Sequence, residues 1–422
     1  MNRKINNNPA LKRALALLGF VCAFNAQADA LFINDATVHT VSRMGVLQDA
    51  DVLIVDGRIQ AVGRELTVPE DATVIEAQGR PLTPGFFAGI TGLGLVEISA
   101  VDSTVDGGLA VDALRPEFDV TPAYNPHSSL IPVTRIEGYS WSVLGANRSG
   151  SIIGGQGRAV SLDGEYRSFI GESVLFIDVG ADASGQSGDS RAAQWMMLEQ
   201  AMAEAAEEVR WSPDPLLTVA GRKTLTGFRV GGTVVFNVDR ASDILQVIEF
   251  SGRHGLNSVI SGGTEAWMVA DQLAEAGIPV LLDALSNLPG SFDTLGARLD
   301  NAAILNEAGV TISFHGAETH QARKLRQIAG NAVANGLPFE AGLAAMTVNP
   351  AVIFSLGEDH GTIEQNSVAD LVIWSGDPLE VTTAADQVII AGKPVEMVSR
   401  QTLLRDRYLP ATTEMPRAYI KP

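Results

Sequence analysis

The sequence predicts an α/β protein, a TIM-like (β/α)8 barrel that carries a composite β-sandwich built from both ends of the chain. Short strands with tight turns occur at each end, whereas apolar runs alternate with amphipathic stretches between them. The 422 residues suffice for one barrel with an accessory layer. We expect the sandwich to comprise residues 29–83 and 356–422, and the barrel residues 84–355.

The two ends of the chain have the pattern of antiparallel strands. Residues 51–55 and 58–62 flank Asp56-Gly57, a strong hairpin signal because both residues tolerate a positive φ. Near the other end, residues 369–374 and 387–390 are each closed by a Gly or Pro turn. Roughly fifty residues cannot bury a core alone. We therefore expect both ends to pair into one layer.

The central part shows βα repetition. Amphipathic stretches of helical character begin at Ser242-Asp243 and Thr264-Glu265, and the second ends at Gly277. The strands between such helices are continuous apolar runs, which indicates burial on both faces and a parallel sheet. The four clearest strands are residues 234–238, 258–260, 279–282 and 310–314.

Three segments fit this repetition less well. Residues 99–135 and 180–190 are rich in glycine and polar residues, and we interpret both as loops that could act as lids over the barrel mouth. Residues 151–157, Ser-Ile-Ile-Gly-Gly-Gln-Gly, lack the Lys-Ser/Thr of a phosphate-binding loop, so a turn near the barrel mouth is expected.

The first 28 residues have the order of a secretory signal. Four basic residues precede an apolar run that is too short to span a bilayer, and Ala26-Gln27-Ala28 follows as a cleavage site. We expect residues 1–28 to be removed and the protein to be periplasmic or secreted. The single cysteine, Cys22, lies inside this signal, so we expect neither disulfides nor a cysteine nucleophile in the mature chain.

The net charge of −19 excludes some partners. An acidic protein is repelled by nucleic acid and by anionic membranes. The acidic residues are spread along the chain, which is the pattern of a solvated surface. We expect no nucleic-acid partner and no membrane contact after signal removal. A small molecule is the expected substrate or ligand.

Several motifs resemble a known family. The segments Asp56-Gly57-Arg58-Ile59 and Leu82-Thr83-Pro84-Gly85-Phe86, followed near the C-terminus by Ala369-Asp370-Leu371-Val372 and Gly376-Asp377-Pro378-Leu379, resemble the entrance and exit of amidohydrolases of the imidazolonepropionase-like type. The resemblance covers nearly the whole chain after residue 28. It implies the same fold, a TIM-like barrel with a composite sandwich, and hydrolysis of carbon–nitrogen bonds assisted by a metal.

The metal motif of the family is missing at the matching positions. In the family, strand one ends in two histidines two residues apart, and alternation points both toward one cation. Here those positions are Ile90 and Gly92, and Ala88 replaces a frequent aspartate. The strand-five histidine matches Asn237, and Thr264 stands where some members carry histidine after strand six.

One cluster of possible ligands remains. His315, Glu318 and His320 are close in sequence, and the resemblance places them at the C-terminal mouth of the barrel. With Asp239 or Glu265 they could bind one divalent metal such as zinc, and an unligated carboxylate, Glu318 or Asp239, could act as general base. The alternative is that the histidines are ordinary loop residues. No cofactor is certain from the sequence.

Two functions remain open. The first is a hydrolase of carbon–nitrogen, non-peptide bonds in small cyclic or blocked amides, with Glu318 and Asp239 as catalytic residues and Asn237, Glu265 and Trp267 in the substrate pocket. The second is a non-catalytic pseudoenzyme that binds a small molecule. Its partners would be further copies of itself or an intact amidohydrolase.

Overall fold

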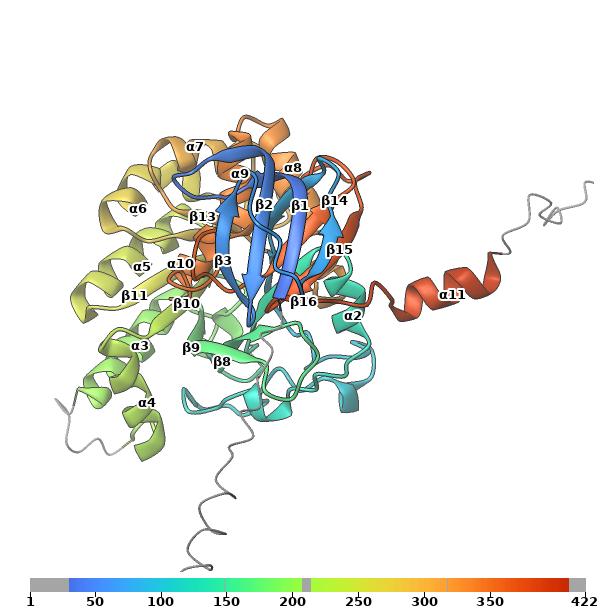
Figure 1. Ribbon diagram of the computed structural model, residues 1–422. Coiled ribbons are helices and arrows are strands. Elements are labelled where there is room, and N and C mark those ends of the chain that lie inside the picture. Colours follow the sequence, from blue (N-terminus) through green and yellow to red (C-terminus); the bar gives the residue numbers. More distant parts are fainter. Residues whose placement is uncertain (1–29, 148, 207–213, 317, 410–422) are drawn as a thin grey trace, which may run out of the picture.

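The computed structural model describes residues 30–147, 149–206, 214–316 and 318–409 (Figure 1). Its strands form two eight-stranded sheets. The expected signal, residues 1–28, lies outside the described residues. Within the described ranges, every helix is too short or too polar to cross a membrane.

The first sheet is built from both ends of the chain. Its order is β16-β15-β14-β5-β1-β2-β3, and β4 also pairs with β1. The strands are β1 (Ala30–His39), β2 (Val46–Val55), β3 (Arg58–Gly63), β4 (Thr73–Glu76), β5 (Pro81–Pro84), β14 (Leu371–Trp374), β15 (Ala385–Ile390) and β16 (Lys393–Pro394). The antiparallel pair β5 and β14 joins the two ends, with Leu371 opposite Pro84. The composite terminal layer is thus confirmed.

The hairpin predicted at Asp56-Gly57 connects β2 to β3. Both residues have a positive φ, 50° and 79°, as the turn requires. Strands β2 and β3 pair antiparallel, with Val55 opposite Arg58. Alternating side chains of the sheet, including Ile54 and Leu371, are fully buried in one cluster. The terminal layer therefore has its own apolar core.

The second sheet forms the barrel, in the order β13-β12-β11-β10-β9-β8-β7-β6. The strands are β6 (Phe86–Thr91), β7 (Tyr139–Leu144), β8 (Ile153–Ser161), β9 (Phe169–Asp178), β10 (Thr233–Val238), β11 (Asn257–Gly262), β12 (Val280–Leu282) and β13 (Ile312–Phe314). The four central strands expected from the sequence are confirmed as β10 to β13. The segment after β13 returns to β6, where the Thr319 hydroxyl accepts a hydrogen bond from the Gly92 N–H (2.9 Å).

Strand β8 departs from the parallel pattern. It pairs antiparallel with both β7 and β9, because the short connections on either side hold no crossover helix. The expectation of a turn at residues 151–157 is therefore wrong for most of that segment. Its glycines instead permit close strand packing: a Cβ on Gly157 would lie 1.8 Å from the Leu144 carbonyl oxygen.

Helices cover the outside of the barrel (Figure 1). The α-helices are α2 (Leu130–Arg135), α3 (Arg191–Ala205), α4 (Val219–Arg229), α5 (Ala241–His254), α6 (Ala270–Ala276), α7 (Asn301–Glu307), α8 (Leu325–Ala334), α9 (Phe339–Met346), α10 (Val348–Ile353) and α11 (Arg400–Tyr408). The 3-10 helices are η1 (Asp102–Thr104), η2 (Thr121–Ala123), η3 (Ser184–Ser187), η4 (Ala266–Val269) and η5 (Thr319–Lys324). Helices α5 and α6 end at Gly255 and Gly277, each with a φ of 64°, and the sequence predicted the end at Gly277.

Candidate ligand-binding site

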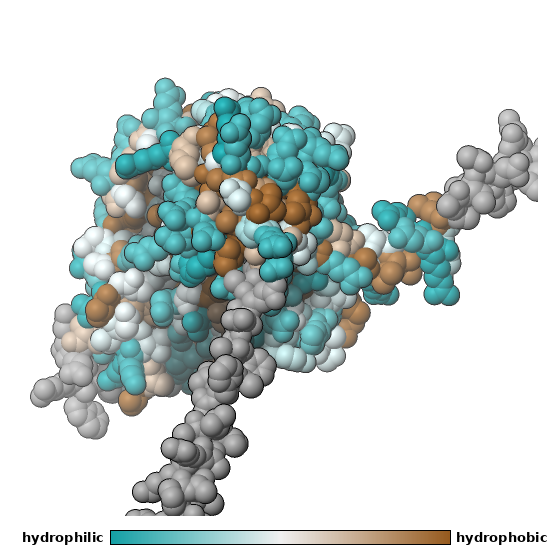
Figure 2. Space-filling model, in the orientation of Figure 1, coloured by the Kyte–Doolittle hydropathy of each residue, from teal (hydrophilic) through white to brown (hydrophobic). Residues whose placement is uncertain are grey.

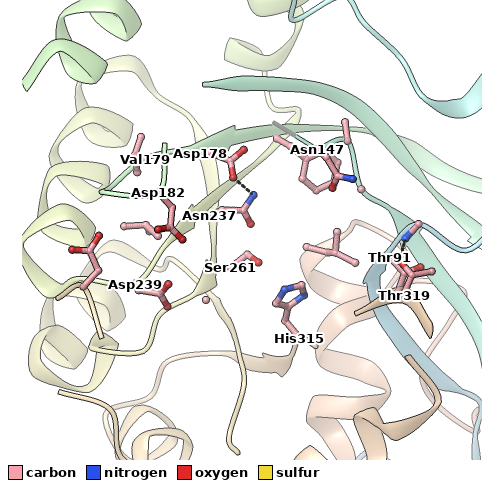
Figure 3. Close-up of a pocket in the computed structure, with 18 of the residues that line it drawn as sticks. Thr91, Asn147, Asp178, Val179, Asp182, Asn237, Asp239, Ser261, His315 and Thr319 are labelled. Atoms are coloured by element: carbon pink, nitrogen blue, oxygen red, sulfur yellow. Dashed lines mark hydrogen bonds between the residues drawn. The ribbon is translucent and has the colours of Figure 1, made fainter. Parts of the chain in front are cut away.

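A cavity of about 570 Å³ opens where the barrel strands end (Figure 3). In a parallel barrel, the C-terminal ends of the strands are where ligands and substrates bind. The first and last strands contribute Ile90, Thr91, Gly92 and His315 to its wall. Most of its other polar lining follows the middle strands: Asp178, Asp182, Asn237, Asp239, Ser261 and Asp293.

Strand alternation explains which side chains reach the cavity. Phe176 and Val235 belong to the apolar cluster inside the barrel, and the residue two positions further along each strand points to the same side. Those residues are Asp178 and Asn237, which lie opposite one another in the ladder. The Asn237 amide donates a hydrogen bond to Asp178 Oδ1 (3.2 Å). The two-residue alternation of the strands thus places apolar side chains in the barrel interior and polar side chains at the strand ends that line the cavity.

Asp239 is held by the loop after β11. Its Oδ1 accepts hydrogen bonds from the hydroxyl (2.6 Å) and the backbone N–H (3.1 Å) of Thr264. Burial raises the pKa of Asp239 above its ordinary value, although these two hydrogen bonds oppose the shift. The structure therefore places this predicted catalytic residue in the cavity with a perturbed carboxyl group.

Asp293 anchors the segment that follows β12. It is buried, and it pairs with Arg191, which also binds Asp243. Its Oδ2 accepts a hydrogen bond from the Ala181 N–H (2.9 Å). Burial alone would raise the pKa of Asp293, but the hydrogen bonds from Arg191 and Ala181 outweigh it and lower that pKa. Through these contacts, Asp293 and Arg191 connect the segment after β12 with the loop at Ala181 and with the start of α5 at the cavity rim.

His315 follows β13 and points into the cavity (Figure 3). Its Nδ1 is buried, and no hydrogen-bond partner for it is found among the described residues. Burial lowers the pKa of His315, with a weaker opposing influence from Asp283. The ring is therefore neutral near pH 7 and could offer one nitrogen as an acceptor.

The chain after β13 separates the three histidine and carboxylate candidates. His320, in η5, places Nε2 3.1 Å from the Glu97 carbonyl oxygen. Glu318 is exposed and precedes η5, and it is not among the described residues that line the cavity. Only His315 of the three lines the cavity. The expected cluster does not form among the described residues, because His315 lines the cavity, whereas His320 contacts Glu97 and Glu318 is exposed.

Glu265 and Trp267 support the structure and do not line this cavity. The Glu265 carboxylate accepts hydrogen bonds from the N–H groups of Ala241 (3.0 Å) and Gly296 (2.9 Å). The Trp267 indole donates to the Gly296 carbonyl oxygen (2.8 Å), and the Arg298 guanidinium lies 4.5 Å from its ring centre. Their expected place in the substrate pocket is corrected: both fix the segment that carries Asp293.

Gly92, which the sequence comparison matched to the second histidine of the family motif, lies in a tightly packed position. A Cβ on Gly92 would lie 3.0 Å from Val96 Cγ2 and 3.1 Å from Thr319 Oγ1. Both neighbours are side chains, and they would have to shift by a few tenths of an ångström to admit a side chain here. Ile90, which the sequence comparison matched to the first histidine, lines the cavity with an apolar side chain.

Sequence reasoning missed several cavity residues. Asp178 directly follows a buried strand, and this position at a strand end was the available signal. Asp293 had no such signal, because it lies in an irregular segment that only Arg191 and the fold bring to the cavity. Asp182 lies in the 180–190 segment that we interpreted as a lid, and it lines the cavity.

The comparisons with known proteins agree with this architecture. A profile of the amidohydrolase family matches residues 308–396. The structure of an amidohydrolase from Thermotoga maritima MSB8 is 25% identical, with a TM-score of 0.76, over 87% of this chain and 99% of that one. A molinate hydrolase is 12% identical, with a TM-score of 0.54, over 94% and 99% of the two chains. No curated protein sequence matches the chain.

Residues 308–396 match the amidohydrolase family, and the fold of the described chain is shared with solved amidohydrolases. Zinc is common in this superfamily, and an adenosine deaminase from Xanthomonas campestris with bound zinc is 19% identical, with a TM-score of 0.51, over 86% of this chain and 92% of that one. In the described part of our chain, no three His, Cys, Asp or Glu side chains are grouped so that they could hold a metal. Ile90 and Gly92, the strand-one residues that the sequence comparison matched to the family's paired histidines, carry no metal-binding side chain.

Proposed function

We propose that the protein is a non-catalytic small-molecule-binding member of the superfamily, in which the paired-metal centre has been lost. The observation that carries this proposal is the strand-one site. Ile90 offers no lone pair, and Gly92, which has no side chain, packs closely on Val96 and Thr319. Activation of water at neutral pH needs a metal or an equally strong electrostatic substitute.

The cavity itself supports ligand binding. A volume of about 570 Å³ lies within the range of small-molecule sites. Its polar groups are mainly acceptors, with carboxylates from Asp239 and Asp293 and a neutral imidazole from His315. Such a lining favours a ligand that presents N–H groups, as amides, amines and ureides do.

The second candidate function is hydrolysis of carbon–nitrogen bonds in cyclic or blocked amides without the paired metals. A specific observation favours it: the same cavity holds a carboxyl group with a raised pKa, Asp239, and an imidazole with a lowered pKa, His315. Perturbed groups of this kind are typical of general acids and bases. Asp239 would take the proton from the attacking water.

One set of measurements separates the two functions. Protein purified from its native compartment, for which we propose the periplasm, is analysed for zinc, manganese and iron. It is then screened for thermal stabilisation by, and turnover of, small amides, amines and ureides. We expect well under one metal per chain and ligand stabilisation without turnover. Turnover that survives chelation and disappears in Asp239→Asn would favour the hydrolase.

The control is Glu318→Gln, which makes the same kind of change at an exposed position that does not line the cavity. We expect this variant to bind ligand as the unchanged protein does, whereas Asp239→Asn weakens binding at least tenfold. A tightly held metal pair would contradict the proposal. A single bound metal lost on Glu318→Gln would instead return His315, Glu318 and His320 to consideration.

A further inference from the structure

Helix α11 (Arg400–Tyr408) projects from the body of the protein (Figure 1). It is a well-formed helix, because Ser399 and Thr402 make a capping box at its N-terminus. None of its residues is buried. Figure 2 shows apolar side chains exposed along it, and the most exposed are Leu403 (60%) and Tyr408 (68%). A folded helix with uncovered apolar side chains needs a partner surface.

The exposed face of α11 has the composition of a protein interface. At 100° per residue, Leu403, Arg407, Arg400, Leu404 and Tyr408 follow one another around a single side of the helix. Arginine and tyrosine are enriched in protein–protein interfaces. A membrane-binding helix would instead separate its apolar residues from its charges. The partner is therefore a protein surface that offers both apolar groups and negative charge.

The segment 97–106 of the same chain offers such a surface. It contains Glu97, Asp102 and Asp106 and has no lysine or arginine, whereas α11 has three arginines and one aspartate. Ile98, Val101 and Val105 of this segment are 55%, 42% and 37% exposed. Acidic and apolar side chains thus alternate along a short exposed segment, which complements the basic and apolar face of α11.

The segment 97–106 lies close to the N-terminal end of α11. Ser129, immediately before α2, donates a hydrogen bond to Glu97 Oε2 (3.2 Å), and His320 in η5 contacts the Glu97 carbonyl oxygen. Helix α11 contacts α2, and Gln401 accepts a hydrogen bond from Arg323 in η5. Helix α11 and the segment 97–106 therefore lie at the same edge of the molecule, yet α11 points away from the body of the protein (Figure 1).

We infer that α11 is an exchange arm: in a symmetric homodimer, the α11 of each chain packs on the 97–106 segment of the other. A two-fold axis near the shared edge would bring both contacts together, as an isologous interface requires. Each nine-residue helix is about 14 Å long, enough to cover the acceptor segment. This interface does not depend on what the barrel cavity binds.

The first test is the mass of the protein in solution. Light scattering during gel filtration at micromolar concentration should give a dimer for the unchanged chain. The double variant Leu403→Asp and Leu404→Asp should shift the dissociation constant at least a hundredfold and give a monomer. The control is Leu409→Asp, which adds one negative charge at the extended residue immediately after the helix and should remain dimeric. Far-ultraviolet circular dichroism checks that all variants are folded.

The second test locates the acceptor. Cys22 is the only cysteine, so in a Cys22→Ser background Val101→Cys and Leu404→Cys supply the only two thiols of each chain. Oxidation should yield covalent dimers, and neither single cysteine variant should do so to the same extent. A monomeric unchanged protein, or a dimer that tolerates Leu403→Asp and Leu404→Asp, would overturn the inference. Dimers without the disulfide would disprove the assigned acceptor.

Discussion

Replacement of Arg191 by methionine should lower the free energy of unfolding, because it removes the ion pairs that hold the cavity rim. The Arg191 guanidinium pairs with Asp243 and Asp293, whose side chains are only 10% and 12% exposed. Loss of one partner from a buried ion pair costs about 3–5 kcal/mol, because the remaining charge stays desolvated. The Arg191 side chain is itself 29% exposed, so we discount this to about 2–3 kcal/mol.

The free energy of unfolding from urea titrations measures the effect. Arg253→Met is the matched control, since Arg253 pairs with Glu199 at a site where the two side chains are 52% and 42% exposed. Exposed pairs contribute about 0–1 kcal/mol, so this variant should remain close to the unchanged protein. Equal losses in the two variants would refute the argument from burial.

The pH dependence provides a second check on the same anchor. Because the folded-state pKa of Asp293 is lowered, its contribution to stability is complete above the unfolded pKa of about 3.9 and is lost as pH falls through the lower folded value. Asp243 acts in the opposite direction, since burial raises its pKa despite Arg191. The stability difference between Arg191→Met and the unchanged protein should therefore shrink under acidic conditions, and a difference independent of pH would contradict the pairing.

Three further predictions concern packing, support and titration. In urea unfolding, Gly157→Ala should destabilise the protein by more than about 3 kcal/mol, because the new Cβ would lie 1.8 Å from the Leu144 carbonyl oxygen. The control Gly185→Ala should be nearly neutral, because a Cβ at that position would meet no atom within 4 Å. Glu265→Ala should lower the free energy of unfolding by about 2–3 kcal/mol, because two backbone N–H groups lose a charged acceptor. If the variant instead lost ligand binding while its stability stayed the same, Glu265 would belong to the pocket. Burial lowers the folded-state pKa of His315, so the contribution of His315 to stability is complete above its unfolded pKa of about 6.5 and declines as pH falls below that value. An imidazole resonance of His315 in nuclear magnetic resonance spectra that titrates above about 6.5 would disprove the burial of the ring.

The sequence by itself determined the architecture. Turn chemistry at Asp56-Gly57, continuous apolar strands such as 234–238, and glycine at helix ends act over a few residues, so each can be recognised without knowing its neighbours in space. Asp239, which the family resemblance suggested as a site residue, also lines the cavity, at the strand ends where a barrel presents its site residues.

Only the tertiary structure decided which polar side chains meet. Asp293 reaches the cavity through its pair with Arg191 on a distant helix, and Glu265 is turned toward backbone N–H groups instead of the cavity. Proximity in sequence suggested that His315 and His320 would act together, yet His315 lines the cavity and His320, in η5, contacts the Glu97 carbonyl oxygen. The physical reason is that convergence depends on the paths of irregular segments, which are fixed by contacts made after the strands have assembled and leave no periodic signal in the sequence.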